Sequence, residues 1–131
     1  PVVVVEELKE LNQGRLEGLT GEDLRRDFQD FLKNWIEHPE SAQLPEGESL
    51  EDLQRRAWAA IVRMIEEHSN DTVAAVAHSF VNLTILCRVL EIPLQKFRKL
   101  RQDATAKNFI EFTEKGIIVR GLNDTCHLSR I

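Results

Sequence analysis

The chain has 131 residues, the size of one ordinary domain and long enough to bury a hydrophobic core. Its composition, 42% hydrophobic and 30% charged, is typical of a globular protein, and its net charge of -5 argues against a nucleic-acid-binding scaffold, which usually carries a basic surface. No apolar run reaches the roughly 18 residues needed to cross a bilayer. We therefore expect one domain over residues 1–131 that binds neither nucleic acid nor membrane.

The cysteine content indicates the compartment. Only two cysteines occur, Cys87 and Cys126. Cys87 lies in an apolar helical pattern and is expected to be a small buried hydrophobic residue. Two such residues do not form a disulfide framework, so we expect a reducing, cytoplasmic environment.

The first third of the chain predicts a strand, a loop and a helix. Residues 2–5 are all valine, a β-branched run that predicts a buried strand. Residues 6–18 are charged and punctuated by glycine, which favours an irregular loop. Thr20 and Asp23 have the spacing of a capping box, which predicts the start of a helix. That helix ends before Pro39, and its apolar residues recur at helical spacing: Leu24, Phe28, Phe31, Leu32 and Trp35.

The middle of the chain predicts a second helix and a second strand. Residues 38–48 form a polar loop, and Ser49 with Asp52 makes a second capping box. The following helix places its apolar side chains on one face, namely Leu50, Leu53, Ala57, Ile61 and Ile65. Residues 72–77 then form a short apolar run, typical of a strand buried on both faces of a parallel sheet.

The last third predicts helices and a hairpin. Residues 80–90 are apolar nearly all round, which indicates a buried helix, and Pro93 can begin another helix that runs to about Arg101. Residues 109–113 and 117–119 flank a Glu-Lys-Gly turn and predict a hairpin. This order of elements predicts an α/β fold of three layers, in which a mostly parallel sheet is flanked by helices.

His78 is the strongest candidate for chemistry. It follows the predicted strand at residues 72–77, and ligands of open α/β sheets bind beyond the carboxyl ends of strands. The backbone N–H groups after it would open a helix N-terminus, which favours anions such as phosphate. A hydrogen-bonded structural histidine is an equally good interpretation of this position taken alone.

Ser79 suggests a different class of enzyme. The segment around it resembles the nucleophile elbow of serine hydrolases, which needs glycine two residues before and two residues after the serine. Ala77 and Val81 occupy those two positions, and a β-branched residue fits poorly in so crowded a turn. The serine-hydrolase interpretation is therefore the weaker one.

Glu10 lies on the glycine-containing loop and could act as a general acid if folding brings it to His78. The alternative is an ordinary solvated loop glutamate, because Glu6 and Glu7 precede it without any distinguishing pattern. No pair of histidines has the spacing of a metal site, and the glycines form no nucleotide-binding fingerprint, so we expect neither a metal nor a cofactor.

Three motifs occur in order with sensible spacing: Leu8-x-Glu10-x-x-x-Gly14-x-x-Glu17-Gly18, then Pro45-x-Gly47-Glu48-Ser49-Leu50, then Val73-x-x-Val76-Ala77-His78. The combination resembles the histidine-phosphatase superfamily, in particular its phosphoglycerate-mutase-like branch, over residues 2–127.

The resemblance implies a reaction and roles for residues. Members attack a small phosphorylated metabolite with a histidine from an Arg-His-Gly motif, form a phosphohistidine and then resolve it. His78 would contact the transferring phosphoryl group and Glu10 would protonate the leaving oxygen. Ser79 and Gln13 would bind phosphate or substrate.

Two departures from the family pattern matter. Ser79 and Phe80 stand where a glycine usually follows the second histidine, and Phe80 is expected to narrow the pocket. No Arg-His-Gly occurs in these 131 residues. We therefore expect an N-terminally truncated domain that is inactive alone and whose missing strand is replaced by a homodimer partner or a complementing N-terminal segment. The main alternative is a non-catalytic binding or structural fragment.

Overall fold

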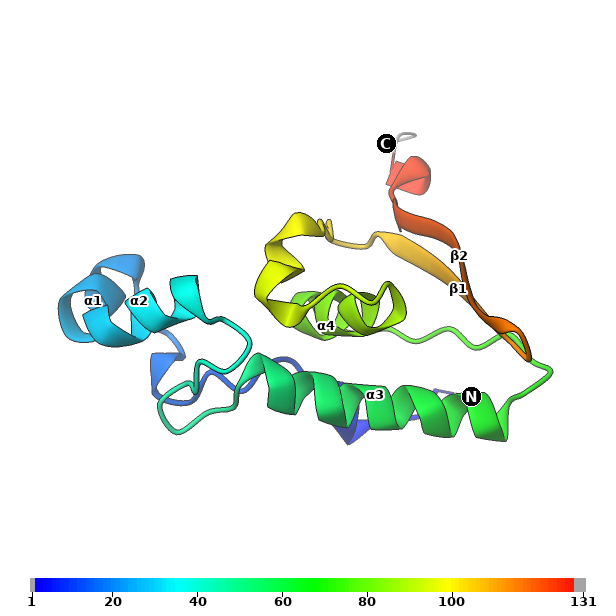
Figure 1. Cartoon of the computed structure of the whole chain (residues 1–131), viewed down its shortest axis with the longest axis horizontal. Coiled ribbons are helices and arrows are strands. Elements are labelled where there is room, and N and C mark those ends of the chain that lie inside the picture. The colour runs from blue at the N-terminus through cyan, green and yellow to red at the C-terminus, as the bar shows by residue number, and fades with distance from the viewer. Residues whose placement is uncertain (1, 129–131) are drawn as a thin grey trace.

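The computed structural model describes residues 2–128. Its regular elements are α1 (Gly21–Asp27), α2 (Gln29–Glu37), α3 (Leu50–Glu67), α4 (Ser79–Val89), β1 (Lys107–Thr113) and β2 (Gly116–Asp124). Short 3-10 helices also occur: Glu6–Leu8 and Gly14–Leu16 precede α1, Leu94–Lys99 follows α4, and Cys126–Leu128 follows β2. Helix α4 lies between α3 and the β1–β2 hairpin, while α1 and α2 form a lobe to one side (Figure 1). The α4 helix is therefore the centre about which the other elements are arranged.

Both predicted capping boxes are present. The Asp23 N–H donates to the Thr20 hydroxyl at 3.2 Å, and the Thr20 N–H donates to the Asp23 carboxylate at 3.1 Å. Ser49 and Asp52 exchange the same pair of bonds at 3.1 and 3.2 Å. Each box satisfies amide groups that have no partner inside the helix, so the two helices begin where the sequence predicts.

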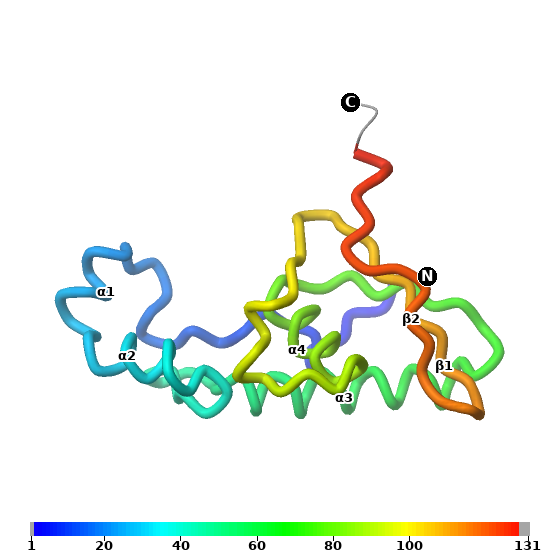
Figure 2. The backbone as a smooth tube through the Cα atoms, turned by 45° about the horizontal axis from the view of Figure 1, so that its top comes forward, coloured from blue at the N-terminus to red at the C-terminus, as the bar shows by residue number. Residues whose placement is uncertain are grey.

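The single helix predicted after Thr20 is wrong, because the chain breaks it at Phe28. That residue has φ -131° and ψ 36°, outside the helical region, and it separates α1 from α2. Leu24 on α1 and Trp35 on α2 both pack against the core from partly buried positions. Figure 2 shows the two short helices folded into one compact lobe, an arrangement that a single straight helix could not adopt.

The core lies between α3 and α4. The buried face of α3 consists of Leu50, Leu53, Ala57 and Ala60. Helix α4 buries side chains on nearly all sides, as predicted for residues 80–90, and Cys87 is fully buried within it. Ile110 and Val119 of the hairpin pack against this core from the other side. The hairpin itself is confirmed, with β1 and β2 antiparallel across the predicted turn.

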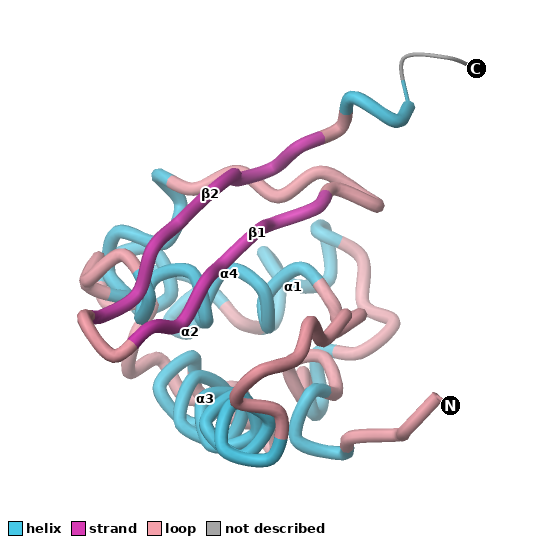
Figure 3. Tube along the Cα trace, turned by 90° about the vertical axis from the view of Figure 1, so that its right-hand side faces the viewer, coloured by secondary structure: helices cyan, strands magenta, loops and turns pink. Residues whose placement is uncertain are grey.

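The strands predicted at residues 2–5 and 72–77 are not formed, and this is the main correction to the predicted fold. Val2 is 98% exposed and Val76 is 94% exposed. Within residues 2–128, sheet pairing occurs only between β1 and β2, so the structure holds a two-stranded antiparallel sheet and no three-layer, mostly parallel one (Figure 3). A strand exists only where a neighbouring strand satisfies its N–H and C=O groups, and these two segments meet none there.

The helix predicted from Pro93 to Arg101 is instead a 3-10 helix over Leu94–Lys99. Leu94 and Phe97 are buried on its inner side. Among residues 2–128, none of the helices combines the length and the apolar character that a membrane span would need.

Candidate active site

His78 is the N-cap residue of α4. It has extended backbone angles, φ -102° and ψ 172°, and its carbonyl accepts the first helical bond from the Asn82 N–H at 2.9 Å. The side chains of His78 and Ser79 are both exposed, and the His78 ring does not cap the helix. The N-terminus of a helix carries partial positive charge, so an anion is favourable beside this histidine.

Glu10 lies at the same helix end, although 70 residues of sequence separate it from Phe80. One carboxylate oxygen accepts from the Phe80 N–H at 3.3 Å, and the other accepts from the Leu11 N–H at 2.8 Å. Phe80 is two residues beyond His78, so the structure brings the predicted acid to the first turn of the helix that His78 caps. Their catalytic roles remain predictions.

The loop that carries Glu10 is fastened to the loop before α3. Asn12 and Glu48 are joined twice, through the Asn12 N–H and the Glu48 carboxylate at 2.9 Å and through the Glu48 N–H and the Asn12 carbonyl at 3.1 Å. A Cβ on Gly14 would lie 2.2 Å from the Pro45 carbonyl oxygen, and one on Gly47 would lie 2.3 Å from the Asn12 oxygen. Glycine is therefore required at both positions, because the two backbones touch.

Arg56 of α3 completes this fastening, and the sequence analysis missed it. Its guanidinium donates to the carbonyls of Glu7 at 2.6 Å, of Lys9 at 2.8 Å and of Glu10 at 3.0 Å. It also donates to both carboxylate oxygens of Glu48, at 3.0 and 2.5 Å. A signal was available, because Arg56 lies three residues after Leu53 and four before Ala60, both on the buried face of the helix.

The Glu48 carboxylate is held ionised in this network. Its side chain is only 16% exposed. Desolvation by burial acts to raise its pKa, but the hydrogen bonds from Arg56 and from the Asn12 N–H outweigh that effect and hold the pKa of Glu48 below its usual range. The ion pair of Glu48 and Arg56 therefore supports the loop that carries Glu10.

The ring of Phe80 lies in a cluster of aromatic side chains. Its ring centroid lies 6.1 Å from that of Trp35 on α2 and 6.0 Å from that of Phe97, so the ring is part of an aromatic cluster at the edge of the core. The cluster ties α2 to the first turn of α4. The expectation that Phe80 narrows a substrate pocket stays a prediction.

Gln13 lies on the same loop as Glu10, three residues further along the chain. It precedes the short 3-10 turn Gly14–Leu16, and its backbone lies against Gly47. His68 ends α3 and pairs with Asp71 at 3.3 Å, a contact on the exposed surface. In the part of the chain that the structure describes, no three His, Cys, Asp or Glu side chains gather as a metal site would require.

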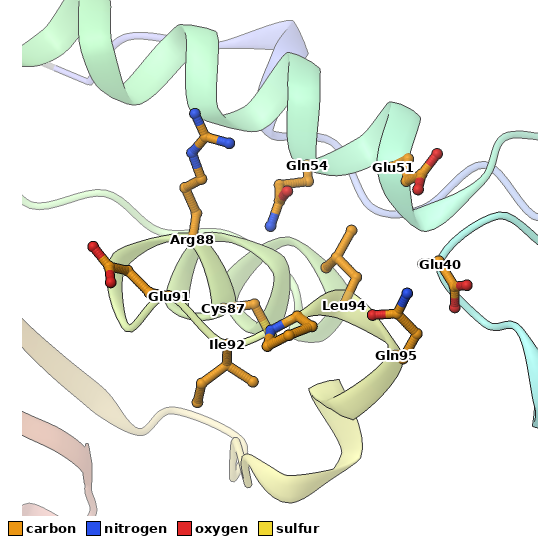
Figure 4. Close-up of a pocket in the computed structure, with 10 residues that line it drawn as sticks. Glu40, Glu51, Gln54, Cys87, Arg88, Glu91, Ile92, Leu94 and Gln95 are labelled. Carbon is orange, nitrogen blue, oxygen red and sulfur yellow. The ribbon is translucent and has the colours of Figure 1, made fainter.

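A pocket of about 560 Å³ lies at the opposite end of α4 from His78, where that helix meets α3 and the Leu94–Lys99 turn (Figure 4). Gln54 projects toward it and donates to the Thr84 carbonyl at 2.8 Å. Cys87 borders the pocket, and burial raises the pKa of its thiol to about 11. This pocket contains none of the residues predicted for catalysis.

Comparison with known proteins defines the family. The sequence model of the histidine phosphatase superfamily (branch 1) matches residues 1–125, so the chain belongs to that superfamily. It is 26% identical over 127 residues to phosphoserine phosphatase 1 of Hydrogenobacter thermophilus, covering 97% of this chain and 60% of that protein. It is 29% identical over 126 residues to a probable phosphoglycerate mutase, GpmB, of Yersinia pestis, covering 92% of this chain and 59% of that protein.

The fold agrees with this assignment. The solved structure of YhfR from Bacillus stearothermophilus matches with a TM-score of 0.88 and 25% sequence identity, over 95% of this chain and 62% of that one. The chain thus spans about three fifths of the length of the relatives it matches.

Proposed function

We propose that this chain contributes the acid and the second histidine of a phosphomonoesterase site that works through a phosphohistidine. His78 contacts the transferring phosphoryl group, Glu10 protonates the leaving oxygen, and Ser79 and Gln13 assist in binding phosphate or substrate. The nucleophilic histidine is not among these 131 residues, since no Arg-His-Gly occurs in them. On this proposal the chain alone does not turn over substrate.

The observation that carries the proposal is the contact between the Glu10 carboxylate and the Phe80 N–H at 3.3 Å. It unites a proton donor, a histidine and the positive end of a helix within one turn of α4. Such a cluster suits an anionic transferring group, because it offers both charge stabilisation and proton transfer.

The substrate that fits is a small phosphorylated metabolite. The relatives named phosphoserine phosphatase and phosphoglycerate mutase support this class of phosphate monoester. Hydrolysis is favoured over mutation, and the reaction needs no metal or cofactor. A cytoplasmic location is part of the proposal, because two cysteines do not form a disulfide framework.

Assembly is part of the proposal. Residues 2–4 and 72–76 are exposed and mostly apolar, and they lack sheet partners within residues 2–128. In the resembled fold a strand carrying the nucleophile lies beside residues 72–77. We propose that a second copy of the chain, or a complementing N-terminal segment, covers this edge.

The direct test is binding of inorganic phosphate to the ¹⁵N-labelled 131-residue chain. We expect the amide resonances of Ser79, Phe80 and Val81 to shift with phosphate, and the affinity to fall about tenfold in His78→Ala, a loss of roughly 1.4 kcal/mol. His68→Ala is the matched control, because His68 also lies at a helix end and is exposed. Shifts confined to other parts of the chain, or equal losses in both variants, would contradict the proposal.

Hydrolysis of an aryl phosphate tests whether the chain alone is catalytically active. We expect the wild-type chain to show no turnover above that of His78→Ala, because loss of a nucleophile costs several orders of magnitude. Turnover that disappears in His78→Ala would show that His78, or a group not recognised in the sequence, performs the attack, and would contradict the expected inactivity of the chain alone. Hydrolysis of an aryl carboxylic ester that is lost in Ser79→Ala, together with an acyl-serine detected by mass spectrometry, would instead favour a serine hydrolase.

A further inference from the structure

Arg56 is saturated with hydrogen-bond acceptors. An arginine side chain has five N–H donors in a rigid planar fork. Those of Arg56 are distributed over the carbonyls of Glu7, Lys9 and Glu10 and the two carboxylate oxygens of Glu48. The side chain is only 25% exposed. A fully used, partly buried fork fixes the position of every group it touches.

We propose that Arg56 is the positioning residue for Glu10. The inference rests on the proposed function, which gives Glu10 its role as the acid. Arg56 donates to the carbonyl oxygen of Glu10. This bond fixes the backbone position from which the Glu10 carboxylate reaches the Phe80 N–H. Glu48 serves as the counter-ion of the guanidinium and accepts from its Nε and from Nη2. The other three N–H groups of Arg56 donate to the loop carbonyls.

A loop carboxylate needs such support. A general acid is effective only within hydrogen-bond reach of the group that it protonates, and an unsupported loop samples many positions. The carbonyls of Glu7, Lys9 and Glu10 would otherwise be satisfied by water. Because all three carbonyls accept from one guanidinium on α3, the position of Glu10 is fixed relative to that long helix.

Arg63 provides an internal comparison. It lies seven residues after Arg56, two turns along the same face of α3, and it contacts the same loop. Its contact is to the Glu7 side chain at 2.9 Å, and it is 46% exposed. Arg63 therefore adds charge near the loop but does not hold the peptide of Glu10.

The experiment measures the Phe80 amide proton in the ¹⁵N-labelled 131-residue chain. Glu10→Gln first gives the shift that the carboxylate contributes to this resonance. We expect Arg56→Met to remove more than half of that contribution, since Glu10 is no longer held beside the helix. Arg63→Met is the matched control and should leave the resonance within the range of its unaffected neighbours.

Arg56→Met that folds, as judged by its far-UV circular dichroism and melting transition, yet keeps the full Glu10 contribution would overturn the inference. If Arg56→Met does not fold, Arg56→Lys decides: it keeps the charge but cannot reach the loop carbonyls and Glu48 together. A normal Phe80 resonance in Arg56→Lys would then refute the positioning role. Failure of phosphate to bind near Ser79, with the Arg56 effect intact, would instead refute the proposed function alone.

Discussion

Gly47 lies where the loop that carries Glu10 and the loop before α3 touch. A Cβ there would lie 2.3 Å from the Asn12 carbonyl oxygen and 3.1 Å from the Gln13 carbonyl carbon. Both are backbone atoms, which cannot move aside without shifting the Glu10 loop. A methyl group at position 47 would therefore displace the loop that carries Glu10 and also lower the stability of the fold.

We expect Gly47→Ala to destabilise the chain by about 1–3 kcal/mol, because overpacking against backbone forces the loops apart. The control is Gly21→Ala in α1, where the nearest atom to the new Cβ is the Arg25 guanidinium at 3.5 Å, an ordinary contact. That variant should stay within about 0.5 kcal/mol of wild type. Urea denaturation of the three chains checks both, and equal midpoints for Gly47→Ala and wild type would contradict the packing described.

At this scale the sequence singled out Glu10 and His78, whose roles stay predictions, but not Arg56, which joins the Glu10 loop to α3. Glu10 and His78 stand in motifs whose order points to one family. Arg56 stands in no such motif, and its partners lie 46 to 49 residues away for the loop carbonyls. Only the folded chain reveals which backbone oxygens a partly buried guanidinium reaches.

Among the elements, α3 is the support for the site, and its N-terminus is secured by Ser49. The Ser49 side chain is buried, and it exchanges hydrogen bonds with Asp52. Thr20 forms the same box at the start of α1, but in an exposed position. The two boxes thus have equal geometry and different surroundings.

We expect Ser49→Ala to cost about 1–2 kcal/mol, because it leaves helix amides without partners in a buried environment. Thr20→Ala should cost about 0.5–1 kcal/mol, since water can replace the lost cap. Thermal denaturation of the two variants measures the difference. A larger loss for Thr20→Ala would mean that α1 and α2 hold more of the stability than the core around α3.

The Glu48 pair predicts a pH dependence. The pKa of Glu48 is lowered on folding from its ordinary 4.5, so the ionised carboxylate adds stability above that value and loses it as the pH falls through the lower folded pKa. Glu48→Gln should therefore be less stable than wild type at neutral pH, and the gap should narrow between about pH 5 and pH 3. Glu46→Gln, whose side chain is 76% exposed, is the control. A gap that stays constant down to pH 3 would contradict this account.

The helices were predictable because their signals are local. A capping box and an apolar stripe lie within a few residues of one another, and the hairpin likewise needs only its own turn. The strands expected at residues 2–5 and 72–77 were wrongly predicted, because a strand depends on a neighbouring strand that is often far away in the chain. The break at Phe28 also escaped prediction, since Leu24, Phe28, Phe31 and Trp35 keep helical spacing across it.

The molecule as a whole leaves a row of valines in solvent. Val2, Val3 and Val4 are 98%, 75% and 81% exposed, and Val76 is 94% exposed. Backbone groups without partners and exposed β-branched side chains both favour pairing with another strand. Within the described chain, residues 2–5 do not pair with residues 72–77.

We expect the chain to form a dimer at micromolar concentration, and Val76→Lys to shift it toward monomer, because a charge on an open edge opposes strand pairing. Ile36→Lys is the control, as Ile36 is also apolar and 70% exposed but lies on α2. Sedimentation velocity distinguishes the species. A wild-type monomer at these concentrations would rule out pairing between copies.

The aromatic contacts around α4 give the molecule two separate optical reporters. It has two tryptophans and no tyrosine. Trp35 packs on Phe80 in the first turn of α4, whereas Trp58 lies under the Arg88 guanidinium at 5.7 Å and against Phe112 of the hairpin at 6.4 Å. In Trp58→Phe the remaining tryptophan is Trp35, whose emission would follow the first turn of α4. In Trp35→Phe the remaining tryptophan is Trp58, whose emission would follow the docking of the hairpin and the end of α4. Comparing the two variants by fluorescence during unfolding would therefore tell whether the two ends of this helix loosen together or one after the other.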